Sequence, residues 1–226
     1  MKRRRPVVRI NRPRAVDATE APPRRQRLMR IGLLGGSFNP AHYGHLGITL
    51  QALKRLRLDR VWWLVSPQNP LKPAADMADF EARLASARAI AGRHPRIRVS
   101  DLEQRLGTRF TVDTLRWLRR HSRARYVWLI GADNLLQMPK WYRWRSLVRM
   151  VPIAVFDREP YCYRALAGPV ARAYARRRLR GRAIARLAET RPPAWVYLRL
   201  RRYRVSSTEI RQRSSHRQAA REEDAP

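Results

Sequence analysis

The sequence has little cysteine, little acid and no long apolar run. Its 226 residues include one cysteine, Cys162, which excludes an internal disulfide framework and a cysteine-based zinc site. No stretch approaches the roughly 18 to 20 uninterrupted apolar residues of a membrane-spanning helix, so we expect no membrane partner. These absences predict a cytoplasmic protein, and a content of 44% hydrophobic residues is enough for a folded core.

Acidic residues are far outnumbered by basic ones. Asp and Glu total 17 against 50 Lys and Arg, which gives a formal net charge of +33, and nearly all of the basic residues are arginines. Such a surface attracts polyanions, but the arginines are scattered along the whole chain instead of gathered in one stripe. The scatter agrees equally well with a coding bias toward arginine, so composition predicts no more than nonspecific nucleic-acid binding.

The first 28 residues differ in composition from the rest. They contain ten basic residues, two acidic residues and four prolines, with too few apolar groups to offset the entropy of ordering. We therefore predict a disordered basic arm over residues 1–28, a single domain over 29–213 and a flexible polar tail over 214–226.

Short apolar runs alternate with amphipathic stretches from residue 29 onward. The predicted strands are Ile31–Leu34, Val61–Val65, Ile97–Val99, Tyr126–Ile130, Val151–Phe156 and Trp195–Leu198. The predicted helices are 42–57, 79–92, Thr111–Arg120 and 164–190, the last with a break at Gly181. This alternation predicts an α/β fold, a Rossmann-like doubly wound parallel sheet with right-handed crossovers and helices on both faces.

The first candidate site follows the first strand, where an open parallel sheet binds its ligands. The motif reads Gly35-Gly36-Ser37-Phe38-Asn39-Pro40-Ala41-His42-Tyr43-Gly44-His45. Two glycines allow a turn that brings backbone N–H groups close to an anion, and the positive end of the next helix points there. His42 and His45 are three apart, so both rings project from one side of the first turn and can neutralise phosphate charge. The motif predicts phosphate binding, although a histidine metal site or a simple surface turn fits it as well.

A second motif, Val205-Ser206-Ser207-Thr208-Glu209-Ile210-Arg211, lies shortly beyond the last predicted strand. Ser206 and Glu209 have the spacing of a capping box, so a short helix is expected to begin there with its first N–H groups exposed. Those groups, the hydroxyls of Ser207 and Thr208, and the permanent charge of Arg211 all suit a polyphosphate. An ordinary helix cap is the alternative, but two predicted anion sites at one edge of the sheet favour phosphate.

Together the two motifs resemble those of the nucleotidyltransferase superfamily, in particular the bacterial nicotinate-nucleotide adenylyltransferases. The resemblance runs from about Met29 to Arg213, and the one departure is Asn39 where the family more often has Asp. It implies transfer of the adenylyl group of ATP to nicotinate mononucleotide, giving nicotinate adenine dinucleotide and pyrophosphate in NAD biosynthesis. It also implies that Mg²⁺ arrives with ATP, with no metal site of the protein's own, and that His42 and His45 contact the triphosphate.

Two further stretches resemble the acceptor side of this family. They are Gly131-Ala132-Asp133-Asn134-Leu135 with Lys140-Trp141-Tyr142, and Thr108-Arg109-Phe110-Thr111-Val112-Asp113-Thr114-Leu115. The resemblance implies that Trp141 stacks on the pyridine ring, that backbone N–H groups around Thr111 and Tyr142 bind the carboxylate, and that Asp133 lies near the ribose or metal. Stacking and donors are also what an anionic heteroaromatic acid requires. Without the flanking match, Trp141, Tyr142 and Trp144 would equally form an aromatic core cluster.

Other parts of the sequence leave alternatives open. Lys72 follows a predicted strand and can reach the phosphate of the mononucleotide, but a solvated role is as compatible. A sister enzyme acting on nicotinamide mononucleotide or phosphopantetheine would share both phosphate motifs and differ around Asp133 to Tyr142. A basic nucleic-acid-binding protein is the alternative from another class. The acid-versus-amide preference, the adenine contacts and a homo-oligomeric state stay open at this point.

Overall fold

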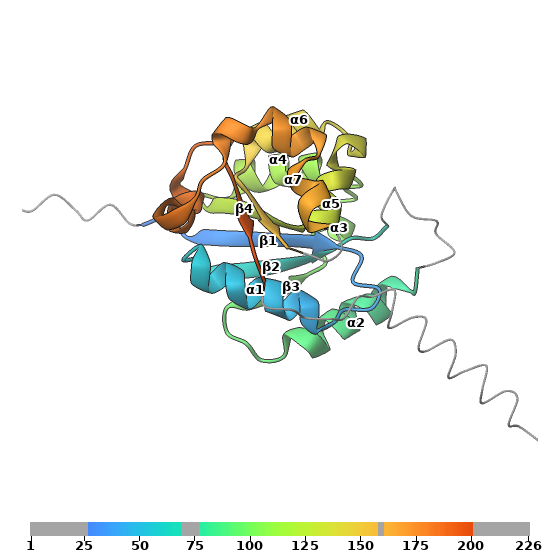
Figure 1. The fold of residues 1–226 in the computed structure, drawn as a ribbon. Coiled ribbons are helices and arrows are strands. Elements are labelled where there is room, and N and C mark those ends of the chain that lie inside the picture. Colours follow the sequence, from blue (N-terminus) through green and yellow to red (C-terminus); the bar gives the residue numbers. More distant parts are fainter. Residues whose placement is uncertain (1–26, 69–76, 158–160, 201–226) are drawn as a thin grey trace, which may run out of the picture.

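A six-stranded parallel sheet forms the centre of the computed structural model, which describes residues 27–68, 77–157 and 161–200 (Figure 1). The strands are β1 (Arg30–Gly36), β2 (Arg60–Val65), β3 (Ile97–Ser100), β4 (Arg125–Gly131), β5 (Ile153–Phe156) and β6 (Trp195–Leu198). They lie in the order β3-β2-β1-β4-β5-β6, so the chain winds outward from β1 in one direction and then in the other. The predicted doubly wound α/β fold is confirmed.

Helices cover both faces of the sheet and bury two separate apolar clusters. One face carries α1 (Tyr43–Arg55), α2 (Phe80–Ala91) and the 3₁₀-helical segment η4 (Gly181–Glu189). The other carries α3 (Leu102–Arg105), α4 (Thr111–His121), α5 (Ala132–Gln137), α6 (Trp144–Met150), α7 (Cys162–Leu166) and α8 (Pro169–Ala173). The 3₁₀ turn η2 (Met138–Lys140) lies between α5 and α6, and the 3₁₀ turn η3 (Ala175–Arg177) follows α8.

The strands supply both clusters because successive side chains of a strand point to opposite faces. In β4, Val127 and Leu129 pack beneath α1 and η4, whereas Trp128 and Ile130 pack beneath the other layer of helices. A strand that is buried on both faces reads as an uninterrupted apolar run, which is why the sequence identified the central strands correctly.

The predicted long helix over 164–190 is wrong. The structure divides this stretch into α7, α8, η3 and η4, and the chain between η3 and η4 lies beside β6, where the N–H of Leu179 donates to the carbonyl of Trp195 at 2.8 Å. Pro169 ends the first piece, because proline lacks a backbone N–H and disfavours helical geometry in the residue before it. The predicted break at Gly181 is found, with a φ of 55° at that residue. The strand predicted from Val151 begins at Ile153, and the short helices α3, α5 and α6 were not predicted.

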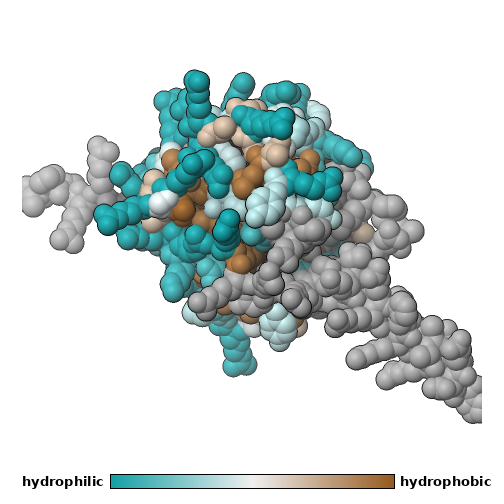
Figure 2. Space-filling model, in the orientation of Figure 1, coloured by the Kyte–Doolittle hydropathy of each residue, from teal (hydrophilic) through white to brown (hydrophobic). Residues whose placement is uncertain are grey.

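The described residues leave the predicted domain limits untested. Apart from residues 27 and 28, the predicted arm lies outside them, as does the tail over 214–226. Within the described ranges no helix is both long enough and apolar enough to cross a membrane. Hydrophilic residues cover most of the visible described surface, with smaller hydrophobic patches between them (Figure 2).

Close packing at the end of β1 gives a stability prediction. A Cβ atom at Gly35 would lie 2.6 Å from the ring of Trp128, whereas one at Gly36 would lie 3.6 Å from Phe38, an ordinary contact. Trp128 is buried and cannot yield without disturbing the core. We expect Gly35→Ala to lower the free energy of unfolding by about 1–3 kcal/mol and Gly36→Ala by less than about 0.5 kcal/mol, measured by denaturant titration. Equal stabilities of the two variants would contradict this packing.

Candidate active site

The site lies where β1, β2 and β4 end side by side. Gly36, the last residue of β1, pairs with Val65 at the end of β2, and the N–H of Ser66 donates to the carbonyl of Gly36 at 2.9 Å. The crossovers diverge on either side of β1, which makes the space beyond it the expected binding crevice of such a sheet. The first predicted motif therefore begins at the centre of this edge.

His42 and His45 form the first turn of α1 through reciprocal caps. His42 is the N-cap residue, and its Nδ1 accepts from the N–H of Gly44 at 3.0 Å. The Nδ1 of His45 accepts from the N–H of His42 at 3.2 Å. The two ring centroids are 3.9 Å apart, so the structure brings the predicted pair together, and the three-residue spacing is that of a capping box.

These caps determine which ring nitrogen carries the proton. An Nδ1 that accepts a hydrogen bond must present its lone pair, so each neutral imidazole carries its hydrogen on Nε2. The histidine pair thus offers two Nε2–H donors, held at the same end of α1 as the backbone N–H groups of its first turn. Donors of this kind stabilise negative charge on phosphate oxygens.

An aromatic column connects His45 to the core. The ring of Phe38 lies 4.7 Å from that of His45 and stacks on Trp63 at 5.2 Å. The Nε1 of Trp63 donates to Thr49 Oγ1 at 2.7 Å, and that hydroxyl donates to the carbonyl of His45 at 2.9 Å. Phe38 was predicted as a phosphate-binding residue, but its side chain is buried, so only its backbone can face a phosphate.

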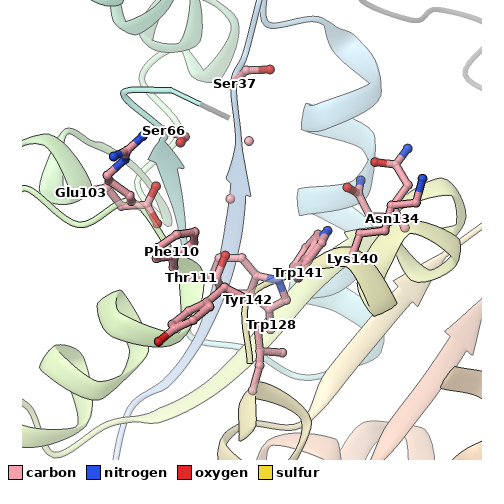
Figure 3. A pocket seen from close by; sticks show the side chains of 15 residues that line it. Ser37, Ser66, Glu103, Phe110, Thr111, Trp128, Asn134, Lys140, Trp141 and Tyr142 are labelled. Atoms are coloured by element: carbon pink, nitrogen blue, oxygen red, sulfur yellow. The ribbon is translucent and has the colours of Figure 1, made fainter. Parts of the chain in front are cut away.

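An open cavity lies beside the end of β1, with about 870 Å³ of empty space that is partly continuous with solvent. Its lining comes from the ends of β1 and β2, from α3, from the start of α4, from β4, and from α5, α6 and the stretch between them (Figure 3). The lining residues are Gly35, Gly36, Ser37, Ser66, Glu103, Arg109, Phe110, Thr111, Trp128, Asn134, Gln137, Lys140, Trp141, Tyr142 and Leu147.

Aromatic rings and the start of α4 form much of the wall of this cavity. Trp141 is half-buried against the apolar cluster and also lines the cavity, so the core-cluster and ligand-facing interpretations both describe it. Tyr142 is exposed, and its ring lies 4.5 Å from that of Phe110. Phe110 and Thr111 line the cavity at the start of α4, and the side chain of the N-cap residue Phe110 accepts no hydrogen bond from the first N–H groups of this helix. Flat rings beside helix N–H groups suit an aromatic anion.

Glu103 is a cavity residue that the sequence did not identify. It is buried, and its Oε1 accepts from Thr114 Oγ1 at 3.1 Å, while Thr114 Oγ1 lies 3.0 Å from Thr108 Oγ1. This network ties α3 to the loop that carries Arg109 and Phe110. Figure 3 shows Glu103 and Ser66 on one side of the end of β1, with Lys140 on the other. The sequence does not indicate that Glu103 is buried, because its burial depends on tertiary packing.

Several predicted site residues do not line this cavity or lie outside the described ranges. Four predicted site residues lie within the described ranges but do not line the cavity: His42, His45, Phe38 and Asp133. Asp133 lies in the first turn of α5, which follows β4, and its neighbour in the chain, Asn134, does line the cavity. Lys72 and the second motif, Ser206, Ser207, Thr208 and Arg211, lie outside the described ranges. The convergence of the two motifs therefore stays a prediction.

Metal ligands are sparse in the described ranges. Within residues 27–68, 77–157 and 161–200, no three His, Cys, Asp or Glu side chains gather as a metal site would require. Asp133, half-buried after β4, is an acidic side chain near the cavity end of the sheet. The donor chemistry here fits a metal ion that takes most of its oxygen ligands from a bound nucleotide.

The burial of Glu103 predicts a specific pH dependence of stability. Burial raises the pKa of Glu103 from its ordinary 4.5 to about 7, although the hydrogen bond from Thr114 opposes the shift. Because the folded protein binds this proton more tightly than the unfolded chain does, the stabilisation is present at acid pH and is lost as the pH rises through about 7. Glu103→Gln removes this titrating group. We therefore expect the free energy of unfolding of the variant, relative to that of wild type, to rise by on the order of 2 kcal/mol from about pH 5 to pH 8.

Denaturant titration across that pH range measures this effect. Glu81→Gln, which removes an exposed carboxyl from the first turn of α2, is the matched control and should keep the wild-type pH profile. Parallel pH profiles for wild type and Glu103→Gln would show that Glu103 does not titrate as its burial requires.

Comparison with known proteins agrees with this geometry. Residues 33–213 match the family model described as Cytidylyltransferase-like. A "Probable nicotinate-nucleotide adenylyltransferase" of Bradyrhizobium sp. (strain ORS 278) is 53% identical over 184 residues, which cover 81% of this chain and 95% of that protein. A protein of the same name from Cereibacter sphaeroides (strain ATCC 17025 / ATH 2.4.3) is 55% identical over 184 residues, covering 81% and 97%.

A solved structure shares the fold. Plasmodium falciparum nicotinic acid mononucleotide adenylyltransferase complexed with NaAD aligns with a TM-score of 0.60 at 17% identity, over 81% of this chain and 83% of that one. At this identity the match establishes the fold, whereas the bacterial relatives establish the family. The chain is a member of the cytidylyltransferase-like family and, within it, of the nicotinate-nucleotide adenylyltransferases.

Proposed function

We propose that the protein transfers the adenylyl group of ATP to nicotinate mononucleotide, giving nicotinate adenine dinucleotide and pyrophosphate. The observation that carries this proposal is one continuous edge of the sheet. There the glycine turn lines the same cavity as Trp141, Tyr142 and the start of α4, and the helix that begins with the histidine pair follows that turn in the chain. The relatives named above carry the same activity in their names. We place the enzyme in the cytoplasm, as the sequence predicts.

The ATP half of the site is assigned to the turn after β1 and the start of α1. Gly35, Gly36 and Ser37 bring the backbone to the edge of the sheet, and the Nε2–H groups of His42 and His45 supply donors for the phosphates. The second motif, which includes Ser206 and Arg211, is assigned to the β and γ phosphates on sequence grounds alone. Asp133 is the acidic side chain that would help to hold a Mg²⁺ ion arriving with ATP, and such an ion would supply positive charge that offsets the charge of the phosphates.

The acceptor half is assigned to the cavity. Trp141 would stack on the pyridine ring, and the N–H groups near Thr111 and Tyr142 would bind the nicotinate carboxylate. Lys140 and Arg109 line the same cavity and add positive charge that favours an acid over a neutral amide. Lys72, from the sequence, stays a candidate for the mononucleotide phosphate.

The chemistry needs alignment more than a deprotonating base. An oxygen of the acceptor's 5′-phosphate attacks the α-phosphorus of ATP in line, and the bond from that phosphorus to the bridging oxygen breaks to release pyrophosphate. A phosphate is already an adequate nucleophile, so the protein contributes by holding both substrates and stabilising charge on the departing group. The histidine donors act on that developing charge.

Pyrophosphate release from ATP, measured with each acceptor in turn, tests the proposed function. We expect release with nicotinate mononucleotide to exceed release with nicotinamide mononucleotide or phosphopantetheine by at least about tenfold in kcat/KM. Release with either of the other acceptors alone would transfer the assignment to a sister adenylyltransferase. Tight, sequence-selective RNA or DNA binding without any release would favour the nucleic-acid alternative.

A histidine variant tests the phosphate donors. His45→Ala removes an Nε2–H from the charge that develops on pyrophosphate, so we expect kcat to fall by about 100-fold or more with little change in KM for nicotinate mononucleotide. His121→Ala, at the exposed end of α4 away from the sheet edge, is the control and should leave kcat unchanged. Wild-type turnover in His45→Ala would remove this residue from the mechanism.

An aromatic variant tests the acceptor cavity. Trp141→Ala removes the stacking surface, so we expect KM for nicotinate mononucleotide to rise by about tenfold while KM for ATP changes by less than about twofold. Trp141→Phe keeps a ring and should recover most of the loss. Steady-state kinetics with each substrate varied separately gives the answer, and an equal rise in both KM values would speak against stacking at this position.

A further inference from the structure

Arg83, on the buried face of α2, makes an unusual set of contacts next to the proposed ATP site. Its side chain is almost fully buried, with 2% exposure, and its guanidinium donates to four backbone carbonyl oxygens. Nε donates to the carbonyl of Ala78 at 2.9 Å. Nη1 donates to the carbonyls of Ser37 at 2.8 Å and Ser66 at 2.7 Å, and Nη2 donates to that of Pro67 at 2.8 Å. One side chain thus links the turns after β1 and β2 to the start of α2.

The burial of this cation demands an explanation. Removing a charge from water is costly unless hydrogen bonds replace hydration, and the four carbonyls supply that replacement. No ion pair within 4.0 Å joins Arg83 to a carboxylate in the described ranges, although the charge of Asp79 acts on it from farther away. Burial lowers the pKa of Arg83, but a guanidinium stays protonated at neutral pH. A charge that no carboxylate neutralises therefore lies beneath the two turns.

The carbonyls that Arg83 binds determine where the adjoining N–H groups point. A trans peptide is planar, with its C=O and the next N–H on opposite sides. Holding the carbonyl of Ser37 toward Arg83 therefore turns the N–H of Phe38 the other way, and holding that of Pro67 does the same for Gln68. Phe38 has a φ of 47°, a conformation rare for a residue with a side chain, so the turn needs such an external constraint.

Two further contacts hold the same turn against α2 and the residues just before it. The N–H of Ala78 donates to Asn39 Oδ1 at 3.3 Å, and the N–H of Ala41 donates to Ser86 Oγ at 3.2 Å. An Asp oxygen could accept the first of these bonds as well as Asn39 does, so the departure from the family's usual residue keeps this contact. Arg83 is the member of this set that also reaches the turn after β2.

The structure assigns Arg83 as a positioning residue for the triphosphate site, one that fixes the turns after β1 and β2 so that their N–H groups and its own buried charge act on the phosphates of ATP. The assignment rests on the proposed function, since it takes ATP to bind at this edge. Arg83 need not touch the substrate, because its carbonyl contacts act through the backbone. Lysine keeps the charge but cannot reach four carbonyls from one nitrogen.

The test compares ligand binding by Arg83→Lys with that of a matched variant on the same helix. Arg88→Lys changes an exposed arginine one turn and a half further along α2 and is the control. Calorimetry at physiological salt, with ATP and nicotinate mononucleotide titrated separately, measures each half of the site without turnover. We expect Arg83→Lys to weaken ATP binding by about tenfold and mononucleotide binding by less than about twofold, with Arg88→Lys matching wild type in both.

Circular dichroism decides whether a loss reflects unfolding. If Arg83→Lys does not fold, Ser86→Ala, which removes only the contact to Ala41, takes its place and should weaken ATP binding by about twofold to threefold. Unchanged ATP binding in a folded Arg83→Lys, an equal loss of both ligands, or an unfolded Arg83→Lys together with wild-type ATP binding in Ser86→Ala overturns the assignment. A wild-type protein that binds ATP but transfers its adenylyl group to no acceptor would refute the proposed function and leave the Arg83 assignment standing.

Discussion

The parallel pairing of β1 between β2 and β4 is the constraint on which the site depends. Because all three strands run in the same direction, their carboxyl ends meet at one edge, and residues from three distant parts of the chain become neighbours there. The turn after β1 provides the histidine pair, the turn after β2 provides Ser66, and the segments after β4 provide Trp141. Without this parallel pairing of the three strands, the groups assigned to the site would not lie close to one another.

The side chains at this edge serve the fold and the site together. Phe38 stacks on Trp63 in the core and contacts the ring of His45 at a tilted angle, so the packing that stabilises the sheet also orients a proposed phosphate donor. Trp128 packs against Gly35 and also lines the acceptor cavity. Substitutions in this part of the core therefore change the positions of residues in the site, because close-packed interiors transmit small displacements.

The sequence predicted those features that depend on local pattern. Buried parallel strands are apolar without interruption, so β1, β2 and β4 were found, and the histidine spacing pointed to a real pair even though its reciprocal capping was not foreseen. The helix expected over 164–190 is wrong because the apolar periodicity continues past Pro169, whereas a helix cannot continue through a residue that lacks a backbone N–H. Arg83 and Glu103 were missed for a different reason: a buried charge looks like a surface charge in the sequence, and only tertiary contacts distinguish the two.

A crystal structure of the full chain with nicotinate mononucleotide and a non-hydrolysable ATP analogue would test the central claim, that one sheet edge holds both substrates, most directly. The account predicts the pyridine ring against Trp141 with its carboxylate at the start of α4, and the phosphates of the analogue between Gly36 and His45. A mononucleotide bound away from this cavity, or a triphosphate bound on another face of the sheet, would contradict it.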